Sequence, residues 1–133
     1  MHQVPASRQG DRIVDPEQVC DAIAVLADGP AVRRTAAVLD ALGDPHRLAI
    51  LLALHHAGDL CVSDIAFAVG MTDSAVSHAL RLLRAHGMVT AQRAGRLVRY
   101  RVAGLLTGRL LDVVSAEAVG EVALHARGAG HPV

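Results

Sequence analysis

Residues 65–87 read IAFAVGMTDSAVSHALRLLRAHG, and this stretch decides the fold. A short apolar segment ends at Gly70, and Thr72 then precedes a longer segment that stops at a further glycine. Because glycine commonly ends helices and threonine caps their starts, the pattern predicts a helix over about 62–69 and a second over 72–86. Two helices joined by a tight turn are typical of a helix-turn-helix.

The second of these helices has two chemically different faces. Apolar residues recur at helical spacing on one face, namely Val76, Ala79, Leu80 and Leu83. The opposite face and the helix start carry short hydroxyls, an imidazole and a guanidinium, from Thr72, Ser74, Ser77, His78 and Arg81. Such groups reach base edges and phosphates in a major groove, so this face is the candidate DNA-binding surface.

A β-hairpin is expected directly after the helix-turn-helix. Residues 88–102 read MVTAQRAGRLVRYRV, and the alternation on both sides of Ala94-Gly95-Arg96 predicts two strands around a turn. A hairpin in this position is a wing. Its Arg93 and Arg96 lie near the tip, where they would contact the phosphate backbone or the minor groove.

The charge distribution agrees with a DNA partner although the formal net charge is +0. All thirteen basic residues are Arg, and seven of them fall between Ser74 and Leu111, a stretch without any acid. Ten of the thirteen acids lie at or before Asp73. A segment of one charge sign is expected where phosphate is contacted, whereas a merely solvated face would carry acids as well.

The rest of the chain predicts further helices. Hydrophobic residues make up 52% of the chain but aromatic residues only 2%, so the core must be aliphatic and an α-rich fold is favoured. Helices are expected over about 15–28, 30–42 and 45–57, since Asp-Pro pairs precede the first and the third. A last segment, over about 105–124, is apolar on more than one face, which is typical of a helix that packs on a partner.

We therefore expect a mainly α winged helix-turn-helix domain over residues 15–124, with a flexible N-terminal tail over 1–14 and a flexible C-terminal tail over 125–133. A homodimer formed through the first and last helices would place two recognition helices about one DNA turn apart, ~34 Å. No apolar run approaches the ~20 residues of a membrane span, and no signal segment is present. A cytoplasmic protein without membrane contact is expected.

The order of elements and the wording CVSDIAFAVGMTDSAVSHALRLLRAHGMVTAQRAGRLVRYRV resemble the ArsR/SmtB family of bacterial winged-helix repressors. The similarity covers about residues 32–122 and includes GDPHRLAIL, CVSDIA, SAVSHAL and GRLVRYRV. It implies a homodimer that represses a promoter by binding double-stranded operator DNA. It also implies release of the operator when an inducer binds, most often a transition or heavy metal ion.

The resemblance implies metal-binding positions as well. Cys61 matches the first cysteine of the CVC motif that one group of the family uses, and Ser63 replaces the second. The expected helix start at Cys61 favours the thiolate, which is a soft metal ligand. Cys20 is its candidate partner, and His125 and His131 in the tail could complete a site. These residue types do not distinguish zinc, cadmium, lead, nickel and cobalt.

Several alternatives stay open. A second group of the family binds metal on its last helix, at positions matched here by Gly104, Leu106, Glu117 and Gly120; three of the four have no ligand atom, so this site is expected to be absent. A repressor of the same fold could respond to oxidants or thiols through Cys61. A winged-helix module could also bind an acidic protein instead of DNA. No catalytic motif is present, so an enzyme is not expected.

Overall fold

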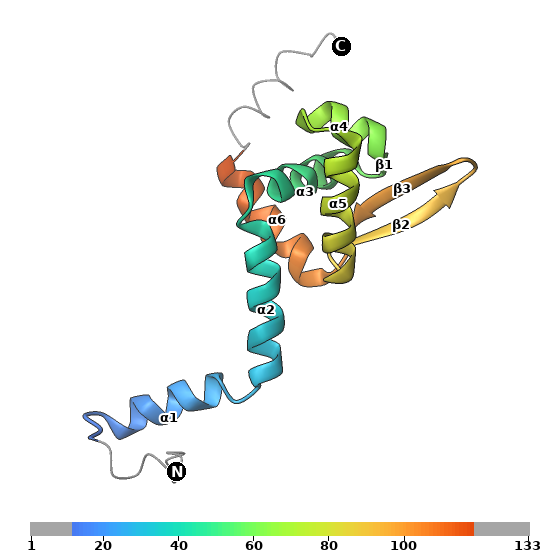
Figure 1. Cartoon of the computed structure of the whole chain (residues 1–133). Coiled ribbons are helices and arrows are strands. Elements are labelled where there is room, and N and C mark those ends of the chain that lie inside the picture. Colours follow the sequence, from blue (N-terminus) through green and yellow to red (C-terminus); the bar gives the residue numbers. More distant parts are fainter. Residues whose placement is uncertain (1–11, 119–133) are drawn as a thin grey trace. The chain divides into compact units, whose positions relative to one another are not determined.

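The computed structural model describes residues 12–118, and the chain forms two compact units, Met1–Ala37 and Val38–Val133, each described here by itself. The first unit contains α1 (Pro16–Val25) and most of α2 (Gly29–Leu42) (Figure 1). Asp15 caps α1, since its side chain accepts a hydrogen bond from the backbone nitrogen of Gln18 at 3.1 Å. Helix α1 ends earlier than predicted.

The second unit is a winged helix-turn-helix, as predicted. Figure 1 shows its elements, which are α3 (Pro45–Ala57), β1 (Leu60–Cys61), α4 (Val62–Val69), α5 (Asp73–Ala85), β2 (Val89–Ala94), β3 (Leu97–Val102) and α6 (Leu105–Ala118). The tail over 125–133 and most of the tail over 1–14 lie outside the described residues, as does the end of the segment predicted to continue to residue 124. No helix within residues 12–118 is long and apolar enough to cross a membrane.

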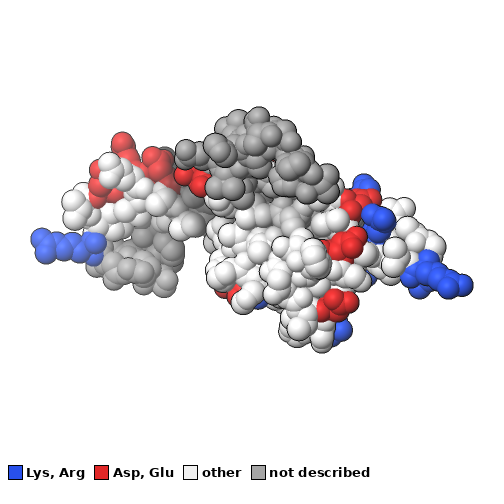
Figure 2. Space-filling model, turned by 90° about the horizontal axis from the view of Figure 1, so that it is seen from above, with Lys and Arg blue, Asp and Glu red and all other residues white. Residues whose placement is uncertain are grey.

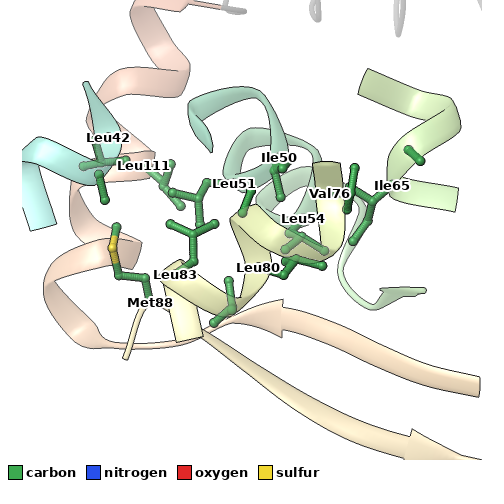
Figure 3. Close-up of a cluster of buried hydrophobic side chains, with 14 residues drawn as sticks. Leu42, Ile50, Leu51, Leu54, Ile65, Val76, Leu80, Leu83, Met88 and Leu111 are labelled. Atoms are coloured by element: carbon green, nitrogen blue, oxygen red, sulfur yellow. The ribbon is translucent and has the colours of Figure 1, made fainter. Parts of the chain in front are cut away.

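An aliphatic core holds the second unit together. The largest fully buried side chains come from four helices and from the start of the wing. They are Ile50, Leu51, Leu54, Ile65, Val76, Leu80, Leu83, Met88, Val89 and Leu111. Figure 3 labels all of these except Val89 and shows them gathered between α3, α4, α5 and α6. Burying one such side chain contributes about 1.5–3 kcal/mol. The apolar face of α5 is therefore fixed inward, and its polar face is left outward.

The glycine between α4 and α5 makes the tight turn possible. Gly70 has a φ of +71° and ends α4 in the left-handed conformation, which a residue with a Cβ adopts at a cost. The chain then reaches Thr72, which caps α5. The two helices of the helix-turn-helix are thus separated by three residues, one more than predicted, because α5 begins after its cap Thr72.

The wing belongs to a three-stranded antiparallel sheet of order β1-β3-β2. β2 pairs with β3 from Val89 opposite Val102 to Ala94 opposite Leu97, which leaves a two-residue turn at Gly95-Arg96. β1 adds a third strand that the sequence analysis did not predict, because a strand of two residues has no periodicity. It places Leu60 opposite Tyr100 and Cys61 opposite Arg99.

Candidate nucleic-acid interface

The outward face of α5 carries the predicted DNA-binding residues. The exposed side chains are Thr72, Ser74, Ser77, His78 and Arg81, while Val76, Ala79, Leu80 and Leu83 on the opposite face are buried. The helix begins at Asp73, because the Thr72 hydroxyl oxygen accepts a hydrogen bond from the backbone nitrogen of Ala75 at 3.1 Å. The face is thus a rigid, solvent-accessible row of hydrogen-bonding groups.

The wing presents a second exposed basic group. Arg93 near the end of β2 and Arg96 in the turn are both exposed. Figure 2 shows blue side chains at the right-hand end of the second unit, toward which the β2–β3 hairpin projects in Figure 1. Guanidinium groups at the tip of a hairpin are suited to phosphate, because they are permanently charged and offer several donors.

A carboxylate that the sequence analysis missed anchors the base of the wing. Arg101 donates two hydrogen bonds to Asp59, from Nε to Oδ1 at 2.9 Å and from Nη2 to Oδ2 at 2.8 Å. Arg99 donates from Nη1 to the backbone carbonyl of Asp59 at 3.4 Å. The hydrogen bond from Arg101 lowers the pKa of Asp59, and the same bond raises the pKa of Arg101. Two of the wing's arginines thus hold β3 to the residue before β1.

Cys61 lies where the wing sheet meets α4. It is the N-cap residue of α4, as predicted, and it is also half of β1, where it pairs with Arg99. The Cys61 side chain makes no capping hydrogen bond, and only 7% of the surface of Cys61 is exposed. Cys61 is a free cysteine. A chemical change at this sulfur would therefore affect both the start of α4 in the helix-turn-helix and the pairing of β1 with the wing strand β3.

The other predicted metal ligands belong to the first unit or lie outside the described residues. Cys20 is half-buried on α1 in the first unit, whereas Cys61 belongs to the second. His125 and His131 lie outside the described residues. Within residues 12–118 no group of three or more His, Cys, Asp or Glu side chains is placed to hold a metal ion. Cys61 is thus at most one ligand of a site whose other ligands remain a prediction.

Of the four positions that match the second type of family metal site, Gly104 has a structural reason to lack a ligand. Gly104 has a φ of +88°, and a Cβ there would lie 3.1 Å from the carbonyl oxygen of Gly87. A side chain at this position would require both a strained backbone and a shift of its neighbour. Leu106 on α6 has no ligand atom, Glu117 is exposed at its far end, and Gly120 lies outside the described residues.

A hollow of about 480 Å³, which we call the α3–α5 hollow, opens beside α5. Its lining comes from the start of α3, the turn before α5 and one flank of α5, namely Asp44, His46, Arg47, Gly70, Met71, Thr72, Ala75, His78, Ala79 and Leu82. His46 is exposed. The sequence pattern gave no sign that it shares a hollow with His78, because the two lie on different helices.

The fold and this exposed face define a winged helix-turn-helix protein. Residues 44–91 match the family model described as a bacterial regulatory protein of the arsR family. The chain is 46% identical over 85 residues to the HTH-type transcriptional regulator NmtR of Mycobacterium tuberculosis, a match that covers 64% of this chain and 70% of that relative. The chain belongs to the ArsR family, as the resemblance of its motifs indicated.

Other similarities support the same placement. A transcriptional repressor, the SmtB homolog of Synechocystis, is 44% identical over 71 residues, which is 53% of each chain. Among solved structures, the homodimeric winged helix-turn-helix DNA-binding domain of Mb0332 from Mycobacterium bovis is similar with a TM-score of 0.60 and 31% identity, over 79% of this chain and 91% of that one. NolR from Sinorhizobium fredii has a TM-score of 0.61 and 27% identity, over 82% and 97%. NmtR and the SmtB homolog are regulators of transcription by name, and the Mb0332 domain is described as a possible ArsR-family transcriptional regulator.

Proposed function

We propose that this chain is a homodimeric repressor that binds operator DNA through α5 and the wing and releases it in response to a transition or heavy metal ion. The observation that supports DNA binding most directly is the two-faced α5, whose buried face is fixed in the core and whose other face exposes Ser74, Ser77, His78 and Arg81. In this proposal α5 lies in the major groove and reads base edges. Arg93 and Arg96 of the wing hold the phosphate backbone.

The DNA-binding part is tested by salt-dependent affinity. The probe is a duplex of about 30 base pairs that the chain itself selects from a randomised pool. Arg81→Ala and the pair Arg93→Ala with Arg96→Ala are expected to weaken binding about tenfold or more. The pair should lower the salt slope by about four, one for each of the two phosphate contacts in each subunit. The matched control is Arg33→Ala with Arg34→Ala, two exposed arginines of α2. Undiminished affinity in both test variants would exclude this interface and favour a protein-interaction module.

Three observations support a metal inducer that involves Cys61. Relatives of this chain include the cadmium resistance transcriptional regulatory protein CadC of Listeria innocua, 35% identical over 72 residues. Cys61 occupies the family's cysteine position at the start of α4. Its backbone also pairs with β3 of the wing. Cys61 with Cys20, His125 and His131 forms the proposed ligand set, and thiolate with imidazole suits zinc, cadmium, lead, nickel or cobalt.

The inducer is tested by titrating each metal into the protein–DNA complex and following release of the duplex. Cys61→Ser and Cys20→Ser are compared with the unchanged chain, with Ser63→Ala as a control for a small change at the same helix start. A cysteine variant that stops responding to one metal supports the site. If both variants respond to every metal like the unchanged chain, the cysteine site is wrong. Release by an oxidant alone, in the absence of metal, would instead favour a thiol-responsive repressor.

A further inference from the structure

The α3–α5 hollow lies on a flank of the recognition helix rather than on its base-facing side. Residues Thr72, Ala75, His78 and Leu82 recur every three or four positions along α5 and line the hollow as one stripe. His78 belongs both to this stripe and to the exposed polar face. The hollow therefore begins where the base-facing side of α5 ends.

The position of the hollow determines what it would meet on DNA, given the proposed function. A major groove is about 12 Å wide, and a helix with its side chains is about 10–12 Å across. A helix that fills the groove consequently has a phosphate strand along each flank. The α3–α5 hollow would face one of these strands, and α3 is the element that forms its far side.

The groups in the hollow are suited to an anion. Its ionisable lining consists of Asp44, His46 and Arg47 from the start of α3 and His78 from α5. Asp44 is engaged, because its Oδ2 accepts a hydrogen bond from the backbone nitrogen of Arg47 at 3.0 Å, which lowers the pKa of the carboxyl group. The Arg47 side chain donates from Nε to the carbonyl oxygen of Ala41 at 3.2 Å.

The two imidazoles are the uncommitted donors. Within residues 12–118, neither His46 nor His78 makes a side-chain hydrogen bond or a salt bridge, although His46 interacts electrostatically with Asp44. An imidazolium donates from both ring nitrogens, and histidine changes its charge between about pH 5 and 8. The lining thus has three groups that can be positively charged, two imidazoles and one guanidinium, and only one carboxylate. This balance favours a negatively charged ligand.

We propose that the α3–α5 hollow binds a backbone phosphate of the operator, with His46 as the principal donor, so that the DNA interface extends from α5 and the wing to the start of α3. The phosphate lies against the flank of α5 and is contacted from the α3 side.

The test compares His46→Gln with the unchanged full chain on the selected duplex of about 30 base pairs. The variant is expected to bind about fivefold or more weakly at about pH 6 and to have a salt slope smaller by about two, one for the phosphate contact of each subunit. His46→Arg, which keeps a permanent cation, should retain affinity. His56→Gln is the matched control, because His56 is exposed on the same helix at its opposite end.

A direct contact is separated from an indirect one by neutralising single phosphates. A set of duplexes is prepared, each with one methylphosphonate at a different position along the groove wall. At one position the methylphosphonate should weaken binding of the unchanged chain but should not weaken binding of His46→Gln any further. If no such position exists, or if His56→Gln weakens binding as much as His46→Gln, the proposed contact is wrong. That result would leave the proposal of DNA binding through α5 intact. The proposed function itself fails only if the Arg81 and wing variants bind DNA as tightly as the unchanged chain.

Discussion

At the scale of single residues, the Thr72 hydroxyl has one observed role, as a helix cap, and one proposed role, as a contact to DNA. Its oxygen already accepts a hydrogen bond from the backbone nitrogen of Ala75 at the start of α5. A hydroxyl can accept and donate at once, so its hydrogen is left for a phosphate oxygen. Thr72 thus stabilises α5 whether or not DNA is present. If removal of the hydroxyl weakens DNA binding, the cause is either the lost helix cap or the lost phosphate contact, and the two can be separated by measuring stability without DNA.

Removing the Thr72 hydroxyl should destabilise the free protein. Thr72→Ala is expected to lower the free energy of unfolding by about 1 kcal/mol, because the orphan amide of Ala75 loses its acceptor. Thr72→Ser keeps the oxygen and should unfold within a few tenths of a kcal/mol of the unchanged chain. Urea unfolding of the three proteins measures the difference. Equal stability of the Ala and Ser variants would mean that the cap contributes nothing to the fold.

At the scale of elements, the wing is held at its base and left exposed at its tip. Asp59 binds Arg101 with two hydrogen bonds and receives a third from Arg99 through its carbonyl oxygen, while Arg93 and Arg96 at the other end are exposed. Arginines that look alike in the sequence thus have different roles. The arginines near the base bind the protein, and those near the tip are available for phosphate.

The anchor should depend on pH with a definite sign. The pKa of Asp59 is lowered below 3.8 by Arg101, so the stabilisation is fully present above pH 3.8 and is lost as the pH falls through the folded-state pKa. Asp59→Asn should therefore unfold at lower urea than the unchanged chain at neutral pH, with faster hydrogen exchange in β3. The difference should shrink as the pH falls below 3.8. Asp21→Asn on α1 is the control, and a gap that persists in acid would contradict the ion-pair explanation.

The elements differ in how far their sequence reveals them. Helices α3 and α5 were predictable because Asp-Pro and Thr-Asp mark their starts and aliphatic residues repeat along them. The β2–β3 hairpin was predictable from alternation around Gly95. β1 was not, because its two residues are recognisable only by their pairing with Tyr100 and Arg99 on a strand far along the chain. The Asp59 anchor and the His46–His78 pair were hidden for the same reason.

At the scale of the whole molecule, apolar side chains remain on the surface of α6. Leu111 is buried in the core, but Leu105 is 72% exposed and Val113 is 68% exposed. A single exposed apolar residue is ordinary, whereas several along one short helix favour a protein partner. The proposed homodimer supplies that partner, and a homodimer would also double the DNA-reading surface.

A charge on this surface should separate the subunits. Val113→Glu is expected to raise the dimer dissociation constant about tenfold or more, because a buried carboxylate without a partner is costly. Sedimentation velocity over a range of concentrations measures the change, and operator affinity should fall with it. Phe67→Glu is the matched control, since Phe67 on α4 is 93% exposed but lies outside the proposed interface. If Phe67→Glu separates the subunits and Val113→Glu does not, the interface involves α4 instead of α6.

The burial of Cys61 at the junction of β1 and α4 has a practical consequence. A thiol reagent can reach a sulfur this well covered only when the junction opens locally, so its labelling rate reports how often the wing base separates from the helix-turn-helix. In a Cys20→Ser background Cys61 is the sole thiol of the chain. The rate at which a thiol reagent labels Cys61 therefore measures wing movement, and it can be compared with and without DNA without attaching a probe beforehand.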